Sequence, residues 1–473
     1  MSPMGAVQMR FAVRLIVALI AIVVAAPNAV AQSAPIDLAK LDSIAGAGVK
    51  QNRTIGLVAA VVKGNDTILF KAYGKADLEW DVPMHVDAMF EVGSIAKQFA
   101  AVAILQLRDA GKLSLDDDIT KWLPVNVDAG GAKLPLRRLL SHTSGVNHWQ
   151  EDDAAIGHIT WNPGAPRDSL YRHIKLAPLQ FPTGEAQAYN NSAFWLLGLV
   201  VEKASGMKYE DYLQQKIFQP LGMTRSMYCD HNANIPKRAH GYHMPPGVPL
   251  RRAIVLPYSL VFAPGALCST AADLVTWLKA LHGGKVLTPA SYTEMITPTK
   301  LNDGSTIRYG MGIKVGENYR GLKIIGHGGT APGFRADAMW YPDAKMAVVV
   351  LMNTSPTSLS PGGVGTALAE NILPLPRPTF TFYTGDATEL VGKYTLFMGG
   401  NQPLGTIDVT SAPNGLSFSI NGGRVQPLPW AGGLTFFAQD QVTLSFHRAN
   451  GDRGPVTELW RDDMGNLGRL KKQ

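Results

Sequence analysis

The sequence predicts an α/β protein in which helices pack on an antiparallel sheet, followed by a separate all-β module. Strand-like runs lie near residue 60 and again near residue 340, and mostly helical patterns occupy the region between them, about residues 112–300. After Asn371 the pattern changes to strict alternation of apolar and polar residues. Alternation over short runs indicates half-buried strands, and apolar repeats of three to four residues indicate helices.

The first elements are a hairpin and a buried helix. The runs Gly56 to Val62 and Thr67 to Tyr73 flank Gly64-Asn65-Asp66, which is typical of a hairpin turn. A helix is predicted from Ser94, and from Phe99 to Leu107 it is apolar on almost every side. A helix without a polar face is expected in the interior.

The remaining elements follow in order. Helices are predicted at Ser192 to Ala204, Tyr209 to Phe218 and Ala271 to Leu281. Strands are predicted at Leu322 to Ile325, Ala336 to Tyr341 and Met346 to Met352. We place this first domain at residues 33–373.

The C-terminal region is predicted to be an independent barrel or sandwich of strands. Pro374, Pro376 and Pro378 make residues 374–379 a stiff linker. Alternation at 406–410, 416–420 and 442–446 then indicates a small β-barrel-like module over residues 380–473.

Composition excludes several classes of protein. With 46% hydrophobic and 17% charged residues among 473, the chain is neither disordered nor collagen-like nor a coiled coil. The 44 Lys+Arg against 37 Asp+Glu form no basic block of the kind that binds nucleic acid. Two cysteines exclude a disulfide scaffold; Cys229 and Cys268 can pair, but two separately buried thiols are the expectation.

The N-terminus resembles a secretory signal. Arg10 and Arg14 precede the apolar run Leu15 to Ala26, and Ala29-Val30-Ala31 supplies small residues for cleavage after Ala31. The alternative, a membrane anchor, needs about 20 apolar residues. We therefore expect residues 1–31 to be removed, no stable membrane anchor to remain, and the protein to be periplasmic or secreted.

Ser94-Ile95-Ala96-Lys97 offers a nucleophile and a base. On a helix that begins at Ser94, the hydroxyl and the Lys97 amine lie one turn apart on one face. Burial lowers the pKa of a lysine, and a neutral amine can accept the serine proton. The alternative is an ordinary N-cap serine. The same spacing recurs at Ser205 and Lys208, where Gly206 indicates a helix end.

Two further motifs carry candidate chemistry. Tyr189-Asn190-Asn191 places a phenol and an amide just before a predicted helix; the alternative is a core tyrosine with a capping asparagine. His327-Gly328-Gly329 continues a strand-like run, and its glycines allow a substrate to lie against the backbone. The N–H groups there are free to hold an oxyanion.

In this order, Ser94-x-x-Lys97, Tyr189-x-Asn191 and His327-x-Gly329 resemble the serine β-lactamase and DD-peptidase superfamily. The similar branch contains class C β-lactamases, D-aminopeptidases and family VIII-type esterases. The stretches 139–145 and 267–274 also resemble hallmarks of this family, and the resemblance runs from about residue 38 to 372. It implies a β-lactamase-like fold, with an antiparallel sheet flanked by helices and a helical subdomain.

The resemblance also implies roles for matching residues. Ser94 would be acylated, Lys97 and Tyr189 would share proton transfer, and Asn191 would orient the substrate. The backbone N–H groups of Ser94 and Thr330 would form the oxyanion hole. No metal or cofactor is implied. Whether Lys97 or Tyr189 is the general base stays open.

This chain departs from the family at the third motif. Lactamases commonly carry Lys-Thr-Gly where His327, Gly328 and Gly329 stand. Histidine is mostly neutral above a pKa of about 6.5, and Gly328 lacks a hydroxyl, so recognition of a β-lactam carboxylate is weakened. Arg335 either restores that charge or points away.

We therefore expect an exported serine hydrolase that acts through an acyl-serine on amide, D-peptide or ester bonds of a small molecule or peptide. A true β-lactamase is one alternative, and a penicillin-binding sensor that does not turn over is another. His142 and Ser144, in the stretch 139–145, are interpreted as a turn that braces the active-site wall. The sequence leaves the oligomeric state open.

Overall fold

The structure is a computed structural model of the whole chain. It describes residues 35–125, 133–148, 170–172, 174, 178–230, 233–245, 247–255, 257–318, 320–373, 383, 385–398, 402–413, 415–439, 442–450, 453–463 and 467–473. The predicted signal segment 1–31 and the predicted linker 374–379 lie outside the described residues.

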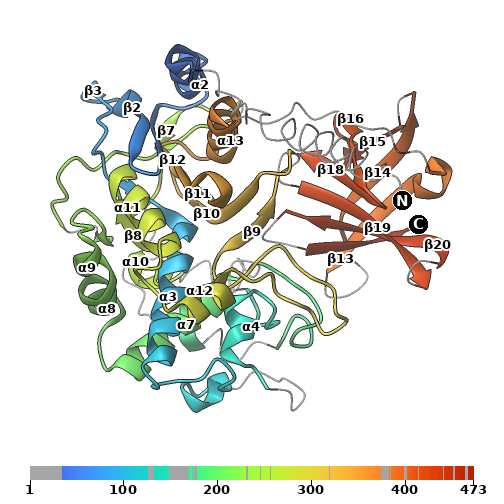
Figure 1. Cartoon of the computed structure of the whole chain (residues 1–473), viewed down its shortest axis with the longest axis horizontal. Helices are drawn as coiled ribbons and strands as arrows, with labels where there is room; N and C mark the ends of the chain where they lie inside the picture. The colour runs from blue at the N-terminus through green and yellow to red at the C-terminus, as the bar shows by residue number, and fades with distance from the viewer. Residues whose placement is uncertain are drawn as a thin grey trace, which may run out of the picture. The chain divides into compact units, whose positions relative to one another are not determined.

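A seven-stranded antiparallel sheet forms the centre of the first domain (Figure 1). Its spatial order is β3-β2-β1-β12-β11-β10-β9. The strands are β1 (Gly56–Lys63), β2 (Asp66–Asp77), β3 (Val82–Pro83), β9 (Lys314–Glu317), β10 (Lys323–Ala331), β11 (Phe334–Tyr341) and β12 (Met346–Met352). The N-terminal hairpin therefore joins the late strands, with Leu57 opposite Met352 in the register of β1 and β12.

Helices cover both faces of this sheet, as the buried strands require. Every residue of β12 is buried. Val348 and Val350 pack in one core with α2 (Leu38–Lys50) and α13 (Pro361–Ile372), which lie side by side in Figure 1. Val349 and Leu351 pack in the other core, with α3 (Ala96–Asp109) and α11 (Ala271–His282). The alternation of side chains along a strand explains this division.

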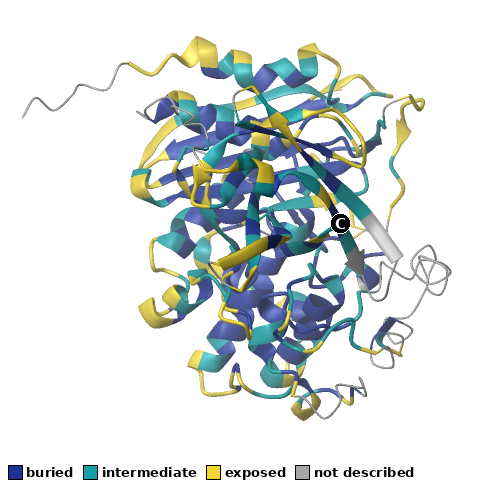
Figure 2. Cartoon of the chain, turned by 90° about the vertical axis from the view of Figure 1, so that its right-hand side faces the viewer, coloured by how far each residue is buried: buried dark blue, intermediate teal, exposed yellow. Residues whose placement is uncertain are grey.

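The helical subdomain lies in the middle of the sequence. Its helices are α4 (Leu136–Leu140), α7 (Asn191–Ser205), α8 (Tyr209–Leu213), α9 (Gln219–Leu221), α10 (Tyr258–Val261) and α12 (Pro289–Ile296). Short turns of 3-10 helix occur at Gly93–Ile95, Ile119–Lys121, Pro342–Ala344 and Ala387–Leu390. The helix predicted over 209–218 is divided, because a π-helical turn at Gln214–Phe218 follows α8. Figure 2 shows the buried residues gathered in the sheet and its helices and the exposed ones largely in turns and at element ends.

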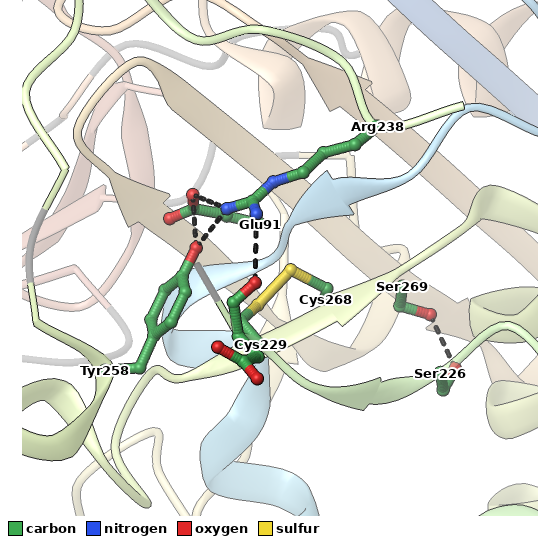
Figure 3. Close-up of a disulfide and its surroundings, with 8 residues drawn as sticks. Glu91, Ser226, Cys229, Arg238, Tyr258, Cys268 and Ser269 are labelled. Carbon is green, nitrogen blue, oxygen red and sulfur yellow. Dashed lines mark hydrogen bonds and ion pairs between the residues drawn. A yellow bond between two sulfur atoms is a disulfide. The ribbon is translucent and has the colours of Figure 1, made fainter. Parts of the chain in front are cut away.

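Two small sheets complete this domain, and one of them corrects an expectation. β4 (Phe90–Glu91), β8 (Leu267–Ser269) and β5 (Met227–Tyr228) form one, and β6 (Tyr242–His243) and β7 (Arg251–Arg252) the other. The expectation of two separate thiols is wrong, since Cys229 and Cys268 form a disulfide (Figure 3). The reason is the register of β5 and β8, in which Met227 pairs with Cys268. This register brings the Cα atoms of Cys229 and Cys268 to 5.2 Å, a distance that a disulfide can span.

The C-terminal region is a nearly closed antiparallel sheet of nine strands, in the order β16-β15-β14-β13-β21-β20-β19-β18-β17. The strands are β13 (Gly392–Met398), β14 (Gln402–Ala412), β15 (Gly415–Ile420), β16 (Gln426–Leu428), β17 (Trp430–Gly432), β18 (Thr435–Gln439), β19 (Val442–Asn450), β20 (Arg453–Asp462) and β21 (Leu467–Lys472). It encloses its own apolar core, which includes Tyr394, Phe436 and Leu459. None of the described helices has the length and apolar character needed to span a bilayer.

Candidate active site

Ser94 stands at the entrance to the buried helix. The chain leaves β4, turns at Gly93 with a φ of +50°, and passes through the 3-10 turn Gly93–Ile95 into α3. Such a positive φ is accessible to glycine at no steric cost. The turn leaves the Ser94 side chain half-buried, at the wall of a cavity of about 490 Å³.

Lys97 lies directly behind Ser94, as the spacing predicts. Its side chain is fully buried. Its Nζ lies 3.1 Å from Ser94 Oγ, 2.7 Å from Asn191 Oδ1 and 3.0 Å from the carbonyl oxygen of Pro264. No carboxylate is among these partners, and burial holds the pKa of Lys97 well below its usual range.

These three contacts orient the amine. A neutral lysine has two N–H donors and one lone pair, while Asn191 Oδ1 and the Pro264 carbonyl are acceptors only. The two N–H groups are therefore directed at those oxygens. The lone pair is left facing Ser94 Oγ, so the serine O–H donates to the lysine.

Tyr189 flanks the same pair. Lys97 Nζ lies 4.7 Å from the centre of the Tyr189 ring. Burial raises the pKa of Tyr189, and a side-chain hydrogen bond with Ser94 opposes this shift. The phenol therefore stays protonated at neutral pH, in contact with the serine hydroxyl. Asn190 caps α7 by accepting from the Ala193 N–H, which places the neighbouring Asn191 at the helix start.

The third motif supplies backbone to the site. Strand β10 passes so close to the Ser94 turn that a Cβ at Gly329 would lie 1.9 Å from the Val92 oxygen and 3.1 Å from the Ser94 nitrogen. A Cβ at Gly93 would lie 2.8 Å from the Thr330 nitrogen. The main chains of Ser94 and Thr330 are thus held together by two glycines. This is the arrangement needed for two N–H groups that converge on one oxyanion.

The side chain of His327 lies away from the cavity. It is buried, and it is not among the residues that line the cavity. Its Nε2 lies 3.0 Å from the Tyr309 hydroxyl, and its Nδ1 hydrogen-bonds the Gly328 carbonyl. Burial, with the nearby charge of Lys314, holds the pKa of His327 well below its usual range. The imidazole is therefore neutral and packs on the side of β10 that faces away from the cavity.

A buried chain of hydrogen bonds explains this placement. The Asn190 N–H donates to His142 Nδ1 at 3.0 Å, and His142 Nε2 lies 3.1 Å from the Tyr309 hydroxyl. Burial also keeps the pKa of His142 well below its usual range, so the neutral ring carries its proton on Nε2. Tyr309 then accepts from His142 and donates to His327, whose proton is assigned to Nδ1.

These buried contacts bear on the roles of His142, Ser144 and Tyr309. His142 and Ser144 do brace the wall: the His142 ring packs 4.4 Å from the Tyr189 ring, and the Ser144 carbonyl accepts from Thr183. Tyr309 was missed from the sequence. Its only local signal is the glycine-containing run Tyr309-Gly310-Met311-Gly312.

The cavity in front of Ser94 has a mainly apolar wall. Its lining residues include Ser94, Asn191 and Thr330, with apolar groups from three segments of the chain: Val261, Pro264, Ala331, Pro332 and Pro356. None of its lining residues comes from the described part of the C-terminal sheet. Arg335 points away, because its guanidinium donates to the carbonyls of Thr357 and Leu359.

The disulfide supports one side of this cavity (Figure 3). Glu91 and Tyr258 line the cavity, and Tyr258 donates to Glu91 at 2.7 Å. Arg238 pairs with Glu91 at 3.2 Å and also donates to the carbonyl of Asp230, next to Cys229. The Glu91 charge is thereby compensated within the wall.

Asp77, Glu79 and His240 lie close enough together to share a metal ion. The Arg252 guanidinium already contacts all three: it lies 2.8 Å from Glu79 and 3.7 Å from Asp77 and hydrogen-bonds His240. With a cation supplied by the chain itself, we assign no metal to this cluster among the described residues.

The fold and the site together define a serine hydrolase with a lysine behind the serine at the start of a buried helix. The chain belongs to the β-lactamase family, because the family model described as Beta-lactamase matches residues 41–369. This match spans the first domain and ends before the nine-stranded sheet.

Similar proteins have several names. Penicillin-binding protein 4* of Bacillus subtilis is 27% identical over 315 residues, which cover 62% of this chain and 66% of that protein. The chain thus spans just under two thirds of that relative's length. Esterase EstB of Burkholderia gladioli is 28% identical over 368 residues, covering 70% of this chain and 93% of the esterase.

Solved structures are similar in fold. The D-amino acid amidase from Ochrobactrum anthropi SV3, complexed with D-phenylalanine, has a TM-score of 0.60 and 26% identity, covering 71% of this chain and 99% of the amidase. The octameric penicillin-binding protein homologue from Pyrococcus abyssi has a TM-score of 0.64 and covers 92% of this chain and 100% of its own. At 24% identity the latter shows the fold alone.

Proposed function

We propose that this protein hydrolyses ester or amide bonds, including those of D-peptides, through an acyl-enzyme on Ser94. The observation that carries the proposal is the buried Lys97 amine, whose two acceptors leave its lone pair facing Ser94 Oγ at 3.1 Å. An esterase and an amidase among the similar proteins support the same chemistry.

In the proposed first step, Ser94 Oγ bonds to the substrate carbonyl carbon while its proton passes to Lys97 Nζ. The oxyanion is held by the N–H groups of Ser94 and Thr330. The bond to the leaving group then breaks, and the leaving group takes a proton from the site. Water hydrolyses the resulting ester on Ser94 by the same steps in reverse order.

The environments of Lys97 and Tyr189 assign the two proton-transfer roles. Burial lowers the pKa of Lys97, which favours a neutral base, and raises the pKa of Tyr189, which favours a protonated phenol. We therefore assign Lys97 as the base in acylation. Tyr189, whose ring lies beside the Lys97 amine, is assigned to protonating the leaving group.

A substrate panel tests the proposal. The purified protein is incubated with 4-nitrophenyl esters, D-phenylalanine amide, nitrocefin and a fluorescent penicillin. We expect turnover of esters or amides exceeding that of nitrocefin, because no lysine stands at position 327 and His327 is buried and neutral. Fast nitrocefin turnover instead indicates a β-lactamase, and stable penicillin label without turnover indicates a sensor.

Two serine variants make the assignment specific. Ser94→Ala is expected to abolish every one of these signals. Ser205→Ala is the matched control, since Ser205 has the same spacing to a lysine but ends α7, where Gly206 has a φ of +74°. Loss of activity in Ser205→Ala with retention in Ser94→Ala would overturn the assignment.

We also propose that the chain is exported. The signal-like pattern of residues 1–31 supports this, and so does the Cys229–Cys268 disulfide, because disulfides persist mainly in oxidising compartments. Expression in a Gram-negative host followed by fractionation and N-terminal sequencing tests it. A periplasmic or secreted product that begins at Gln32 is expected, and an uncleaved cytoplasmic product contradicts the proposal.

A further inference from the structure

The hairpin of β6 and β7 places three basic side chains at the cavity, those of His243, Arg251 and Arg252. Tyr242 is paired with Arg252 across these strands, and His243 with Arg251. Residues directly opposite in an antiparallel pair share one face, and successive residues alternate between faces. The hairpin therefore has one face with Tyr242 and Arg252 and another with His243 and Arg251.

The first face is fixed by acidic partners. Tyr242 donates to Glu79 at 2.8 Å, and Arg252 contacts the same carboxylate at 2.8 Å. Arg252 also pairs with Asp77 at 3.7 Å. This attachment holds the hairpin in position and compensates the charge of Arg252.

The second face has no such compensation. Arg251 and His243 both line the cavity that contains Ser94. Within the described part of the chain, no ion pair or side-chain hydrogen bond joins Arg251 or His243 to another group. Glu91 is the one acidic residue of the lining, and Arg238 already pairs with it.

Strand β10 and its neighbour β11 do not supply an unpaired positive charge to the cavity. His327 is buried and neutral, and Arg335 is bonded to the carbonyls of Thr357 and Leu359. The mainly apolar cavity thus has its uncompensated positive charge on the hairpin, on the side chain of Arg251.

We propose that Arg251 and His243 form a subsite for an anionic group of the substrate, so that the preferred substrates carry a carboxylate or phosphate beyond the bond that is cleaved. This inference rests on the proposed function, since it concerns the substrate of Ser94. It makes the hairpin a specificity-determining element, with the apolar wall contacting the rest of the acyl or leaving group.

Matched substrates test the subsite. The 4-nitrophenyl esters of succinic, adipic and suberic acid, each with a free terminal carboxylate, are compared with their terminal methyl esters. A terminal phosphonate series of the same lengths distinguishes carboxylate from phosphate recognition. We expect kcat/KM to favour the anionic member of at least one pair by about 2- to 5-fold at low salt, as for an exposed ion pair. The preference is expected to fall as salt rises, because screening weakens exposed charges.

Variants locate the preference. Arg251→Gln is expected to bring the ratio of kcat/KM for the anionic ester to that for its methyl ester close to one. Arg251→Lys is expected to retain part of this ratio, and His243→Gln is expected to reduce it. Arg424→Gln is the control, because it removes an exposed positive charge from the C-terminal sheet. An equal effect in Arg424→Gln, or no preference for any anionic ester in the wild type, would overturn the subsite.

Failure of the proposed function is recognised separately. If no ester is hydrolysed, monomethyl suberate and monomethyl adipate are titrated into the Ser94→Ala protein by calorimetry. Binding that Arg251→Gln weakens supports the subsite without hydrolysis. The anionic subsite is contradicted if Ser94→Ala and the Ser94→Ala, Arg251→Gln double variant bind equally well, or if neither binds.

Discussion

The hydroxyl of Tyr309 lies 3.0 Å from Nε2 of His327 and 3.1 Å from Nε2 of His142. One buried phenol therefore joins the stretch that braces Tyr189 to the strand that supplies Thr330. Tyr309 accepts from the His142 ring and donates to the His327 ring, so its hydroxyl satisfies both Nε2 atoms. It is a positioning residue, since it lines no part of the cavity.

Replacing Tyr309 with phenylalanine should lower both stability and kcat. The change leaves two buried histidine nitrogens unpaired, which costs about 1–3 kcal/mol in the free energy of unfolding. We expect kcat to fall about 10-fold or more with KM little changed, because the catalytic geometry is displaced. Tyr292→Phe is the control: Tyr292 bonds His282 at 2.8 Å, away from Ser94, and its loss should affect stability alone. Full kcat in Tyr309→Phe would exclude the positioning role.

Lys97→Arg should abolish activity although it keeps a basic side chain. A guanidinium stays protonated in proteins, so it has no lone pair to accept the Ser94 proton. The expected loss is at least about 100-fold in kcat/KM, measured with a 4-nitrophenyl ester. Lys208→Arg, at the second S-x-x-K, should retain wild-type activity.

The wild-type pH profile follows from the same amine. Burial lowers the pKa of Lys97, and the neutral form is the active one. Activity should therefore be present well below pH 10.5 and should decline only as acid protonates the amine. An acid limb centred near 10.5 would contradict the lowered pKa of Lys97.

Gly329→Ala should remove most activity, because its Cβ would lie 1.9 Å from the Val92 oxygen and would push β10 away from the Ser94 turn. Losing one oxyanion donor costs about 100- to 1000-fold in kcat. Gly328→Ala is a matched control on the same strand, since its nearest neighbours would be 3.4 Å away. Equal effects of the two substitutions would contradict the close-approach explanation.

Stability should decrease as the pH falls from about 6.5 to 5. Burial lowers the pKa of His142 and His327 well below the usual value and that of His148 to about 4. Below about 6.5 the unfolded chain binds protons that the folded chain does not, so the free energy of unfolding falls with falling pH. Each such histidine contributes up to about 1.4 kcal/mol per pH unit. Denaturant titrations at pH 7.5, 6 and 5 measure this.

A buried histidine outside the site tests whether buried histidines cause this loss of stability in acid. Burial lowers the pKa of His282 to about 3, so His282→Gln should reduce the pH slope. His85→Gln should not change it in this way, because His85 is 63% exposed and pairs with Asp87 on the surface. A stability that rises between pH 6.5 and 5 would contradict the explanation.

Removing the disulfide should destabilise the wall that holds Glu91 and Tyr258. The bridge closes a loop with a sequence separation of 39 residues, for which chain entropy gives roughly 4 kcal/mol. The Cys229→Ser, Cys268→Ser double variant should therefore have a lower Tm, measured by calorimetry. The wild type in reductant should show a similar decrease, whereas an unchanged Tm in both would contradict the stabilising role.

Much of the candidate site is local in sequence and was predictable. Ser94 and Lys97 are three residues apart, and the apolar run after them predicted the buried helix that lowers the lysine pKa. The strands of the central sheet were also predictable, because alternation and apolar runs record burial within a single segment.

The long-range partners were not predictable, since no local period records which distant segments become neighbours. The register of β5 and β8 decided that Cys229 and Cys268 pair. The outward direction of Arg335 depends on carbonyls that lie more than twenty residues away.

The sequence by itself thus determined the chemical groups of the site and the helix that carries two of them, because their spacing and burial are encoded within a few turns of chain. Only the tertiary structure decided which groups face the cavity. It turned His327 inward to Tyr309 and left Arg251 facing the Ser94 cavity, since those orientations depend on strand register and on partners brought together by packing.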